Sequence, residues 1–135
     1  MLHKLKRIND YVERYGNNTL KEHDLTLAQC HVLGHLLNSE KQECTLKELE
    51  KSMNVAQSTS AGVVMRLEKK GFVITYTDPN DKRVKKVKLS DNAEELLEVI
   101  RISMGSVEDR VLKSLTNIEK LTLKMLVDKI ADNLE

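Results

Sequence analysis

The 135-residue sequence has no tryptophan, one phenylalanine, three tyrosines, two cysteines, one proline and five glycines. Two cysteines are too few for a disulfide framework, and the spacing of Cys30 and Cys44 is not that of a zinc knuckle. So little proline and glycine favours a mainly helical chain. The scarcity of aromatic side chains argues against single-stranded nucleic acid, which proteins bind by stacking bases on aromatic rings.

Long apolar runs and catalytic motifs are also missing. No stretch of about 18 apolar residues exists, so we expect no membrane partner. The N-terminal "MLHKLKRIND" meets charge too early for the core of a signal peptide, and we therefore expect a cytoplasmic protein. Because no Gly-rich phosphate loop, nucleophile motif or pair of catalytic carboxylates is recognisable, we expect neither an enzyme nor a bound cofactor.

Positive charge is concentrated in one segment of a nearly neutral chain. The whole sequence has 22 basic and 21 acidic residues. Residues 66–90 contain eight basic and three acidic side chains, a net charge of +5. Residues 1–65 contain eight basic and eight acidic side chains, and residues 91–135 contain six basic and ten acidic ones. Five cations fall in the seven positions from Lys82 to Lys88. Such a block indicates a surface for an anionic partner, or an edge strand protected against aggregation.

Three hydroxyl residues predict where helices begin. Thr26, Thr45 and Thr116 are each followed three residues later by Gln or Glu, the pattern in which both side chains cap free backbone N–H groups. These signals predict helices over 27–38, 46–53 and 117–133. Apolar residues three to four apart predict an earlier helix from residue 2, ending near 16–18 unless Leu20 extends it.

A helix-turn-helix and a wing are predicted in the middle of the chain. The helix over 46–53 is broken by "NVAQS", and a second helix over 57–70 ends at Gly71. In this second helix Ser60, Val63, Val64 and Leu67 share one face. The runs 72–77 and 84–89 flank the turn "DPNDKR", which predicts a two-stranded ribbon with Lys82 and Arg83 at its tip. The alternative is an ordinary helical hairpin in a bundle.

The last third of the sequence predicts further helices with extensive apolar faces. Ala93, Leu97, Ile100, Met104, Val107 and Val111 recur with a period near 3.5, and the helix over 117–133 is also rich in apolar residues. A winged domain of about 60 residues cannot cover this surface, so we expect the terminal helices to pack against a second copy. A monomeric antiparallel bundle is the alternative.

Three stretches resemble the MarR family of bacterial transcriptional regulators. They are "LTLAQCHVLGHL" at 25–36, "MRLEKKGFV" at 65–73, and the wing pattern formed by Asp81, Arg83, Leu89 and Ser90. The resemblance implies a winged helix-turn-helix domain at 25–90, flanked by N-terminal (1–24) and C-terminal (91–135) dimerisation helices. It also implies a homodimer that binds a palindromic double-stranded DNA operator, as a repressor relieved by a small inducer.

The resemblance assigns roles to individual residues. Arg83 is the wing arginine that enters the minor groove, and Asp81 orients the wing, with Arg66 as one candidate partner. Lys82, Lys85 and Lys86 are expected at phosphates. The remaining DNA contacts are expected from the recognition helix, at Gln57, Ser58, Thr59, Ser60 and Arg66. Three positions depart from the family pattern: Ser60 replaces an apolar residue, Gly62 replaces a long polar or basic one, and Ala93 replaces a common glycine.

The signal that such a regulator would sense is left open. Relatives bind small phenolic or anionic molecules between the dimer helices and the winged domain, where His31, His35 and Tyr11 are candidates here. His31 and His35, four residues apart, are weak candidates for a zinc site, and Cys30 is a weak candidate for a redox switch. The alternative from another class is a winged-helix protein-interaction module that does not bind DNA.

Overall fold

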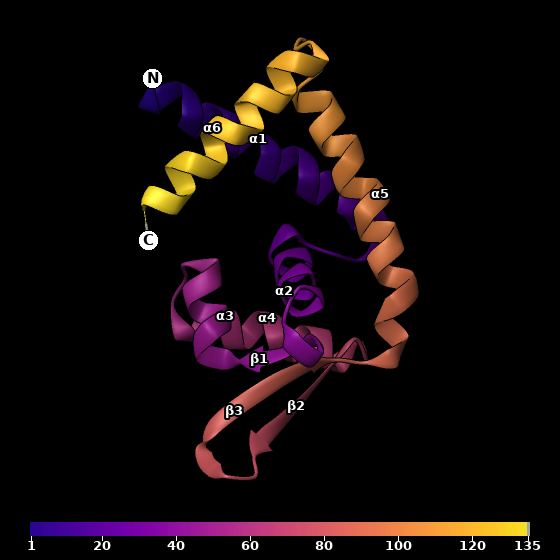
Figure 1. The fold of residues 1–135 in the computed structure, drawn as a ribbon. Helices are drawn as coiled ribbons and strands as arrows, with labels where there is room; N and C mark the ends of the chain where they lie inside the picture. The colour runs from indigo at the N-terminus through magenta and orange to yellow at the C-terminus, as the bar shows by residue number, and fades with distance from the viewer. Residues whose placement is uncertain (135) are drawn as a thin grey trace.

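The computed structural model describes residues 1–134, which form a mainly helical structure with one small sheet (Figure 1). In chain order the elements are α1 (Leu2–Leu20), α2 (Leu27–Leu37), β1 (Glu43–Thr45), α3 (Leu46–Met53), α4 (Gln57–Lys69), β2 (Val73–Asp78), β3 (Asp81–Leu89), α5 (Glu94–Val111) and α6 (Asn117–Asn133). Short 3₁₀ turns occupy Lys21–His23, Glu40–Gln42 and Asp91–Ala93. The predicted fold class, mainly α with a small β-wing, is confirmed.

The three predicted capping boxes are all formed. The hydroxyl of Thr26 accepts the backbone N–H of Gln29, and the Gln29 side chain accepts the N–H of Thr26 in return. Thr45 with Glu48 begins α3 in the same way, and Thr116 with Glu119 begins α6. Each box satisfies two of the N–H groups that a helix leaves without partners at its start. The predicted helix starts are therefore accurate to the residue.

Helix α1 does not end at residues 16–18 but continues to Leu20. Gly16 is buried against Leu27: a Cβ atom at position 16 would stand 3.0 Å from both terminal methyl groups of that leucine. The Asn17 side chain accepts the backbone N–H of Leu27 at 2.9 Å, and Leu20 is fully buried. Gly16 and Asn17, which favour the end of a helix, instead allow α1 to pack closely against the start of α2.

The sheet has one strand more than the predicted ribbon, and its hairpin is tighter. β1 pairs antiparallel with β3, which also pairs with β2, so the strand order is β1-β3-β2. A three-residue strand leaves too little alternation to be recognised in the sequence. Only Pro79 and Asn80 lie between β2 and β3, and Lys82 and Arg83 are therefore strand residues beside the tip rather than turn residues.

One core joins the helix-turn-helix to the sheet. Apolar side chains from α2, α3, α4, β2 and β3 pack together, among them Val32, Leu36, Leu49, Leu67 and Val87. The face predicted for the second helix is confirmed, since Ser60, Val63, Val64 and Leu67 are all buried. This core fixes α4 against the sheet from which the hairpin extends (Figure 1). None of the helices within residues 1–134 is both long and apolar enough to cross a membrane.

The apolar seam of α5 is used within the chain. Ala93 and Val107 are buried and the other four members are partly buried, because α5 packs against α1 and the start of the winged domain. This seam is thus partly covered within the chain, and its contact with a second copy stays a prediction. Helix α6 differs, since it has no buried residue among those described and carries exposed apolar side chains along its length.

Candidate nucleic-acid interface

Helix α4 begins without a side-chain cap. Asn54, in the left-handed conformation with φ of 52°, ends α3 and turns the chain toward α4. The N-cap of α4 is Ala56, which offers no side-chain acceptor, and the first turn contains no acidic residue. The first backbone N–H groups of α4 and the positive end of its dipole are thus not neutralised by a neighbouring side chain. This end of α4 suits a phosphate group.

The exposed face of α4 carries four of the five α4 residues predicted to contact DNA. Gln57, Ser58, Thr59 and Arg66 are all exposed. Ser60 does not lie on this surface, because it is 1% exposed and its hydroxyl donates to the Gln57 carbonyl at 3.0 Å. A serine at this apolar position is tolerated because the backbone of its own helix satisfies the hydroxyl.

The wing presents cations along β3. Lys82, Arg83, Lys85 and Lys88 are exposed, whereas Val87 on the same strand is buried in the core. Lys86 is half-buried and approaches Asp78, with 3.6 Å between Lys86 Nζ and Asp78 Oδ2. Lys88 was not among the predicted contacts, although the strand alternation around Val87 indicates that it faces outward. Four cationic side chains of one strand therefore remain at the surface.

Asp81 holds Arg83, and not Arg66, in place. Its Oδ1 accepts Arg83 Nε at 3.1 Å and the Arg83 backbone N–H at 3.0 Å, and its Oδ2 accepts Nη2 at 3.3 Å. These bonds lower the pKa of the Asp81 carboxyl below its ordinary value. The Arg83 side chain remains 91% exposed. Asp81 thus orients an outward guanidinium within its own strand, while the suggested partner Arg66 lies on α4.

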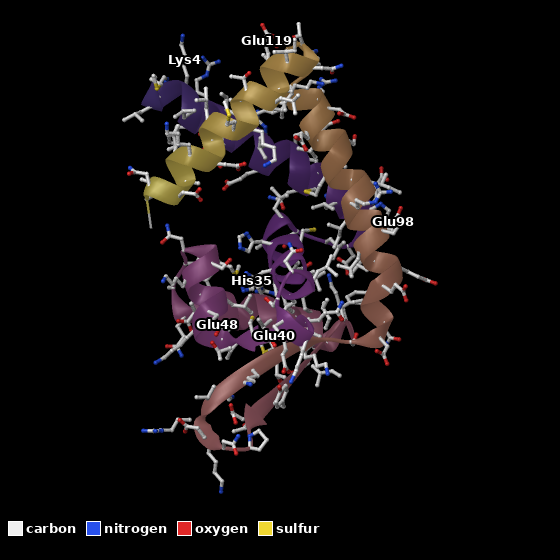
Figure 2. All side chains as sticks on the ribbon, in the orientation of Figure 1. Lys4, His35, Glu40, Glu48, Glu98 and Glu119 are labelled. Atoms are coloured by element: carbon white, nitrogen blue, oxygen red, sulfur yellow. The ribbon has the colours of Figure 1, made fainter. Side chains whose placement is uncertain are left out.

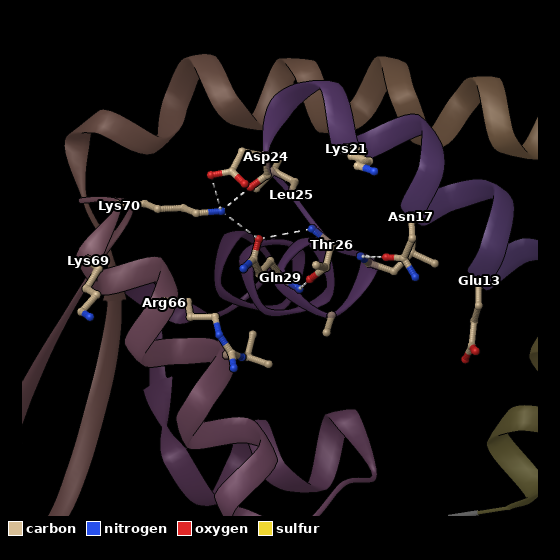
Figure 3. Close-up of a pocket in the computed structure, with 13 residues that line it drawn as sticks. Glu13, Asn17, Lys21, Asp24, Leu25, Thr26, Gln29, Arg66, Lys69 and Lys70 are labelled. Carbon is tan, nitrogen blue, oxygen red and sulfur yellow. Dashed lines mark hydrogen bonds and ion pairs between the residues drawn. The ribbon is translucent and has the colours of Figure 1, made fainter.

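A pocket of about 830 Å³ lies beside the second half of α4, and Arg66 of the exposed face is among its lining residues (Figure 3). Its walls come from α1, the segment before α2, the start of α2 and the second half of α4. Lys70, just after α4, reaches across: its Nζ lies 3.3 Å from Gln29 Oε1 and 3.4 Å from an Asp24 carboxylate oxygen, and it donates to the Asp24 carbonyl. Gln29 is only 4% exposed. Neither His31, His35 nor Tyr11 is among the residues that line this pocket.

The surroundings of the histidines and cysteines do not favour metal binding or thiol oxidation. His31 Nε2 lies 3.0 Å from Ser52 Oγ, and burial, together with the nearby His35, lowers the pKa of its imidazole. Within residues 1–134 no three His, Cys, Asp or Glu side chains are arranged to hold a metal ion. Cys30 and Cys44 are buried, and burial raises the pKa of each thiol to about 11. Such thiols are protonated and unreactive at neutral pH.

Comparison with known proteins agrees with this architecture. The model of the MarR family matches residues 25–85, which span α2 to most of β3. The winged domain of this chain, residues 25–85, matches the MarR family. The predicted resemblance is thereby confirmed, and members of the MarR family are DNA-binding transcriptional regulators.

Solved MarR-family structures match nearly the whole chain. Apo MarR from E. coli is 29% identical, with a TM-score of 0.82 over 96% of this chain and 95% of that one. A mutant of E. coli MarR complexed with operator DNA is also 29% identical, with a TM-score of 0.81 over 95% and 91%. BpsR from Bordetella bronchiseptica is 25% identical, with a TM-score of 0.84 over 96% of both chains. The likeness therefore includes α1, α5 and α6 as well as the winged domain.

Proposed function

We propose that this protein is a MarR-family regulator, a homodimeric repressor that binds a palindromic DNA operator and is released by a small ligand. The observation that carries the DNA-binding role is the combination of an exposed polar start of α4 with the cationic strand β3. In this proposal Gln57, Ser58 and Thr59 enter a major groove. Arg83, held by Asp81, enters the adjacent minor groove, and Lys82 and Lys85 bind phosphates.

The uncovered surface of the terminal helices supports a homodimer. In α6, Ile118 is 77% exposed, Leu121 70% and Ile130 60%, and Leu2 and Leu5 at the start of α1 are exposed as well. Monomeric proteins seldom expose continuous apolar surface of this extent. We infer that residues 1–24 and the part of 91–135 around α6 pair with the same helices of a second copy, leaving residues 25–90 to bind DNA.

The pocket beside α4 is the proposed ligand site. Its floor includes Leu25, Leu27 and Val63, and Arg66 and Lys69 stand at its side, which suits a small organic anion. The BpsR structure concerns regulation of DNA binding by 6-hydroxynicotinic acid, a molecule of this kind. Because one wall of the pocket is α4, a ligand there would shift α4 against α1 and α2. Successive major grooves lie about 34 Å apart, so a change in the span between two α4 helices weakens both half-sites together.

Operator binding is tested with DNA from beside the gene. In a footprint and a gel shift we expect protection of one palindromic segment. Arg83→Ala should lower the affinity by about tenfold or more, as for loss of a specific arginine contact. Arg101→Ala, at an exposed arginine on α5 that pairs with Glu98, is the matched control and should leave the affinity unchanged.

The same experiment separates the proposal from its rival. A winged-helix module that binds only proteins predicts no sequence-dependent protection of any duplex. Light scattering on the same samples should give twice the mass of one chain for the wild type and for Arg83→Ala. A protein that is monomeric and binds all duplexes equally weakly at low ionic strength would contradict both the dimer and the interface.

A further inference from the structure

A second hollow lies between the first half of α1 and the end of α5, away from the wing. Its volume is about 750 Å³. Figure 2 shows Lys4, which lines it, at the opposite end of the molecule from the β2–β3 hairpin. Five lining side chains are cationic and one is acidic: Lys4, Arg7, Arg14, Arg110, Lys113 and Asp10. We refer to this hollow as the distal cleft.

The cations of the distal cleft have no carboxylate partners within the described residues. The acidic member, Asp10, is engaged by Lys6, with 2.8 Å between Lys6 Nζ and Asp10 Oδ2. No ion pair in residues 1–134 involves any of the five lining cations. The lining carries +5 from its cations and −1 from Asp10, a balance of +4. Like charges gathered around one concavity raise its positive potential and attract anions.

Two of these cations are held by aromatic rings. Tyr11 and Tyr15 are stacked, with 5.8 Å between ring centroids and 6° between ring planes. The guanidinium of Arg14 lies 5.9 Å from the Tyr11 centroid, and that of Arg110 lies 5.7 Å from the Tyr15 centroid. Arg110 Nε also donates to the Tyr11 hydroxyl at 3.3 Å. Each guanidinium has five N–H donors, so most remain free although the group is fixed in position.

The sequence of α1 places these side chains on one stripe. Lys4, Arg7, Tyr11 and Arg14 recur at intervals of three and four residues, beside the separate apolar stripe that includes Leu5 and Ile8. A helix face that meets another helix is ordinarily apolar. Here the side facing the end of α5 is cationic, and the packing of α1 against α5 does not itself require that charge.

We propose that the distal cleft binds a small polyanion carrying at least two negative charges, a phosphate ester or a di- or tricarboxylate. The volume is within the range of small-molecule sites, about 300–1,000 Å³. Arginine side chains bind carboxylate and phosphate groups through paired N–H donors, which suits the two guanidiniums fixed by Tyr11 and Tyr15. This site is separate from the proposed ligand pocket beside α4. Because Lys4, Arg7 and Arg14 lie within residues 1–24, which are proposed to pair with a second copy, the distal cleft must stay open in the homodimer.

Calorimetric titration of the full chain at low ionic strength tests the proposal. Pyrophosphate and citrate are the two probes, and monovalent formate is the control for charge number. We expect one of the two polyanions to bind once per chain, to raise the melting temperature, and to bind at least tenfold more tightly than formate. Binding of pyrophosphate alone assigns a phosphate ligand, and binding of citrate alone assigns a polycarboxylate.

Two double variants locate the binding site. Arg7→Gln with Lys113→Gln removes two cleft cations that stack on no aromatic ring, and it should weaken polyanion binding by about tenfold, as expected for two partly exposed charge contacts. Its melting temperature without polyanion should equal or exceed that of the wild type, because repulsion is relieved. Lys82→Gln with Lys85→Gln removes two wing cations and should leave polyanion binding unchanged.

Three results would overturn the proposal. The first is the absence of binding by both polyanions. The second is loss of binding in the wing variant rather than in the cleft variant, which would place the anion on the DNA-binding face. The third is dissociation of the dimer in the cleft variant with unchanged polyanion binding, which would show that the cations meet acidic groups of a second copy.

Discussion

The salt dependence of DNA binding measures the number of phosphates that the wing neutralises. The proposed interface contains four exposed cations in each chain, Arg66, Lys82, Arg83 and Lys85, and hence eight in a dimer. If each of these cations, Arg83 in the minor groove included, neutralises one phosphate charge, log K falls against log salt with a slope of roughly −7, since each neutralised phosphate contributes about −0.9. Lys82→Gln with Lys85→Gln removes four contacts per dimer, and the slope should become roughly −3.6.

Fluorescence anisotropy of a labelled operator between about 50 and 200 mM salt gives both slopes. Over this fourfold range the wild-type affinity should fall by about 10⁴ and that of the double variant by about 10². A mixed-sequence duplex should show the same change in slope, because phosphate contacts carry no sequence information. Lys4→Gln is the control for position: it removes one lysine charge at the far end of the molecule (Figure 2), and its slope should equal that of the wild type.

The result that refutes this reasoning is an unchanged slope in the double variant. Lysines that point into solvent on the bound complex release no counterions, and β3 would then be an edge strand protected by charge rather than a contact surface. A slope that falls equally in Lys4→Gln would show that the whole charge of the chain, and not the position of the wing lysines, determines binding.

Three further predictions test the packing, the wing and the thiols. Gly62→Ala should raise the free energy of unfolding by about 1 kcal/mol through helix propensity, since a Cβ there meets only Arg66 at 3.7 Å. Gly16→Ala should lower the free energy of unfolding by about 1 kcal/mol, because overpacking against Leu27 costs about 1–3 kcal/mol. Urea midpoints equal to that of the wild type would contradict both predictions. Asp81→Ala should weaken operator binding less than Arg83→Ala, and the double variant should match Arg83→Ala in anisotropy; additive losses would show that Asp81 acts independently. The pKa of the Cys30 thiol is raised to about 11 in the folded chain, so the contribution of the neutral thiol to stability is complete below the ordinary thiol pKa near 9 and is lost as pH rises toward 11. In denaturant titrations, Cys30→Ala should therefore lose less free energy of unfolding than the wild type between about pH 9 and 11. Identical pH profiles of the two proteins would be the contrary result.

Local signals predicted the helices well because helix starts depend on neighbouring residues. The capping boxes at Thr26, Thr45 and Thr116 each need only a partner three residues away, and all three are formed. The continuation of α1 through Gly16 depends instead on Leu27, which is distant in sequence. No local pattern distinguishes a glycine that ends a helix from one that admits a neighbouring side chain.

In the candidate interface, too, local sequence patterns predict some features and three-dimensional packing decides others. The exposed face of α4 follows from the period of its apolar residues, so Gln57, Ser58 and Thr59 were correctly expected at the surface. The position of Ser60 also follows from that period, which places it among Val63, Val64 and Leu67. The family resemblance nevertheless includes Ser60 among the expected DNA contacts. Burial outweighs polarity here because the Gln57 carbonyl accepts the Ser60 hydroxyl.

Charge counted along the sequence could not reveal the distal cleft. Its cations come from two segments that look unremarkable on their own, residues 1–65 with eight basic and eight acidic side chains and residues 91–135 with an acidic excess. Helix α1 itself places Arg14 beside Tyr11, and the packing of α1 against α5 brings Arg110 to Tyr15, with Asp10 as the one acidic residue of the lining. In the wing, by contrast, the cations are adjacent in sequence and remain adjacent on β3. A basic surface can therefore be predicted from sequence where one strand carries it, but only tertiary contacts identify a basic surface shared by two helices. The distal cleft is the stricter test of this view, because the order of residues alone does not bring Arg110 and Lys113 to the cationic stripe of α1.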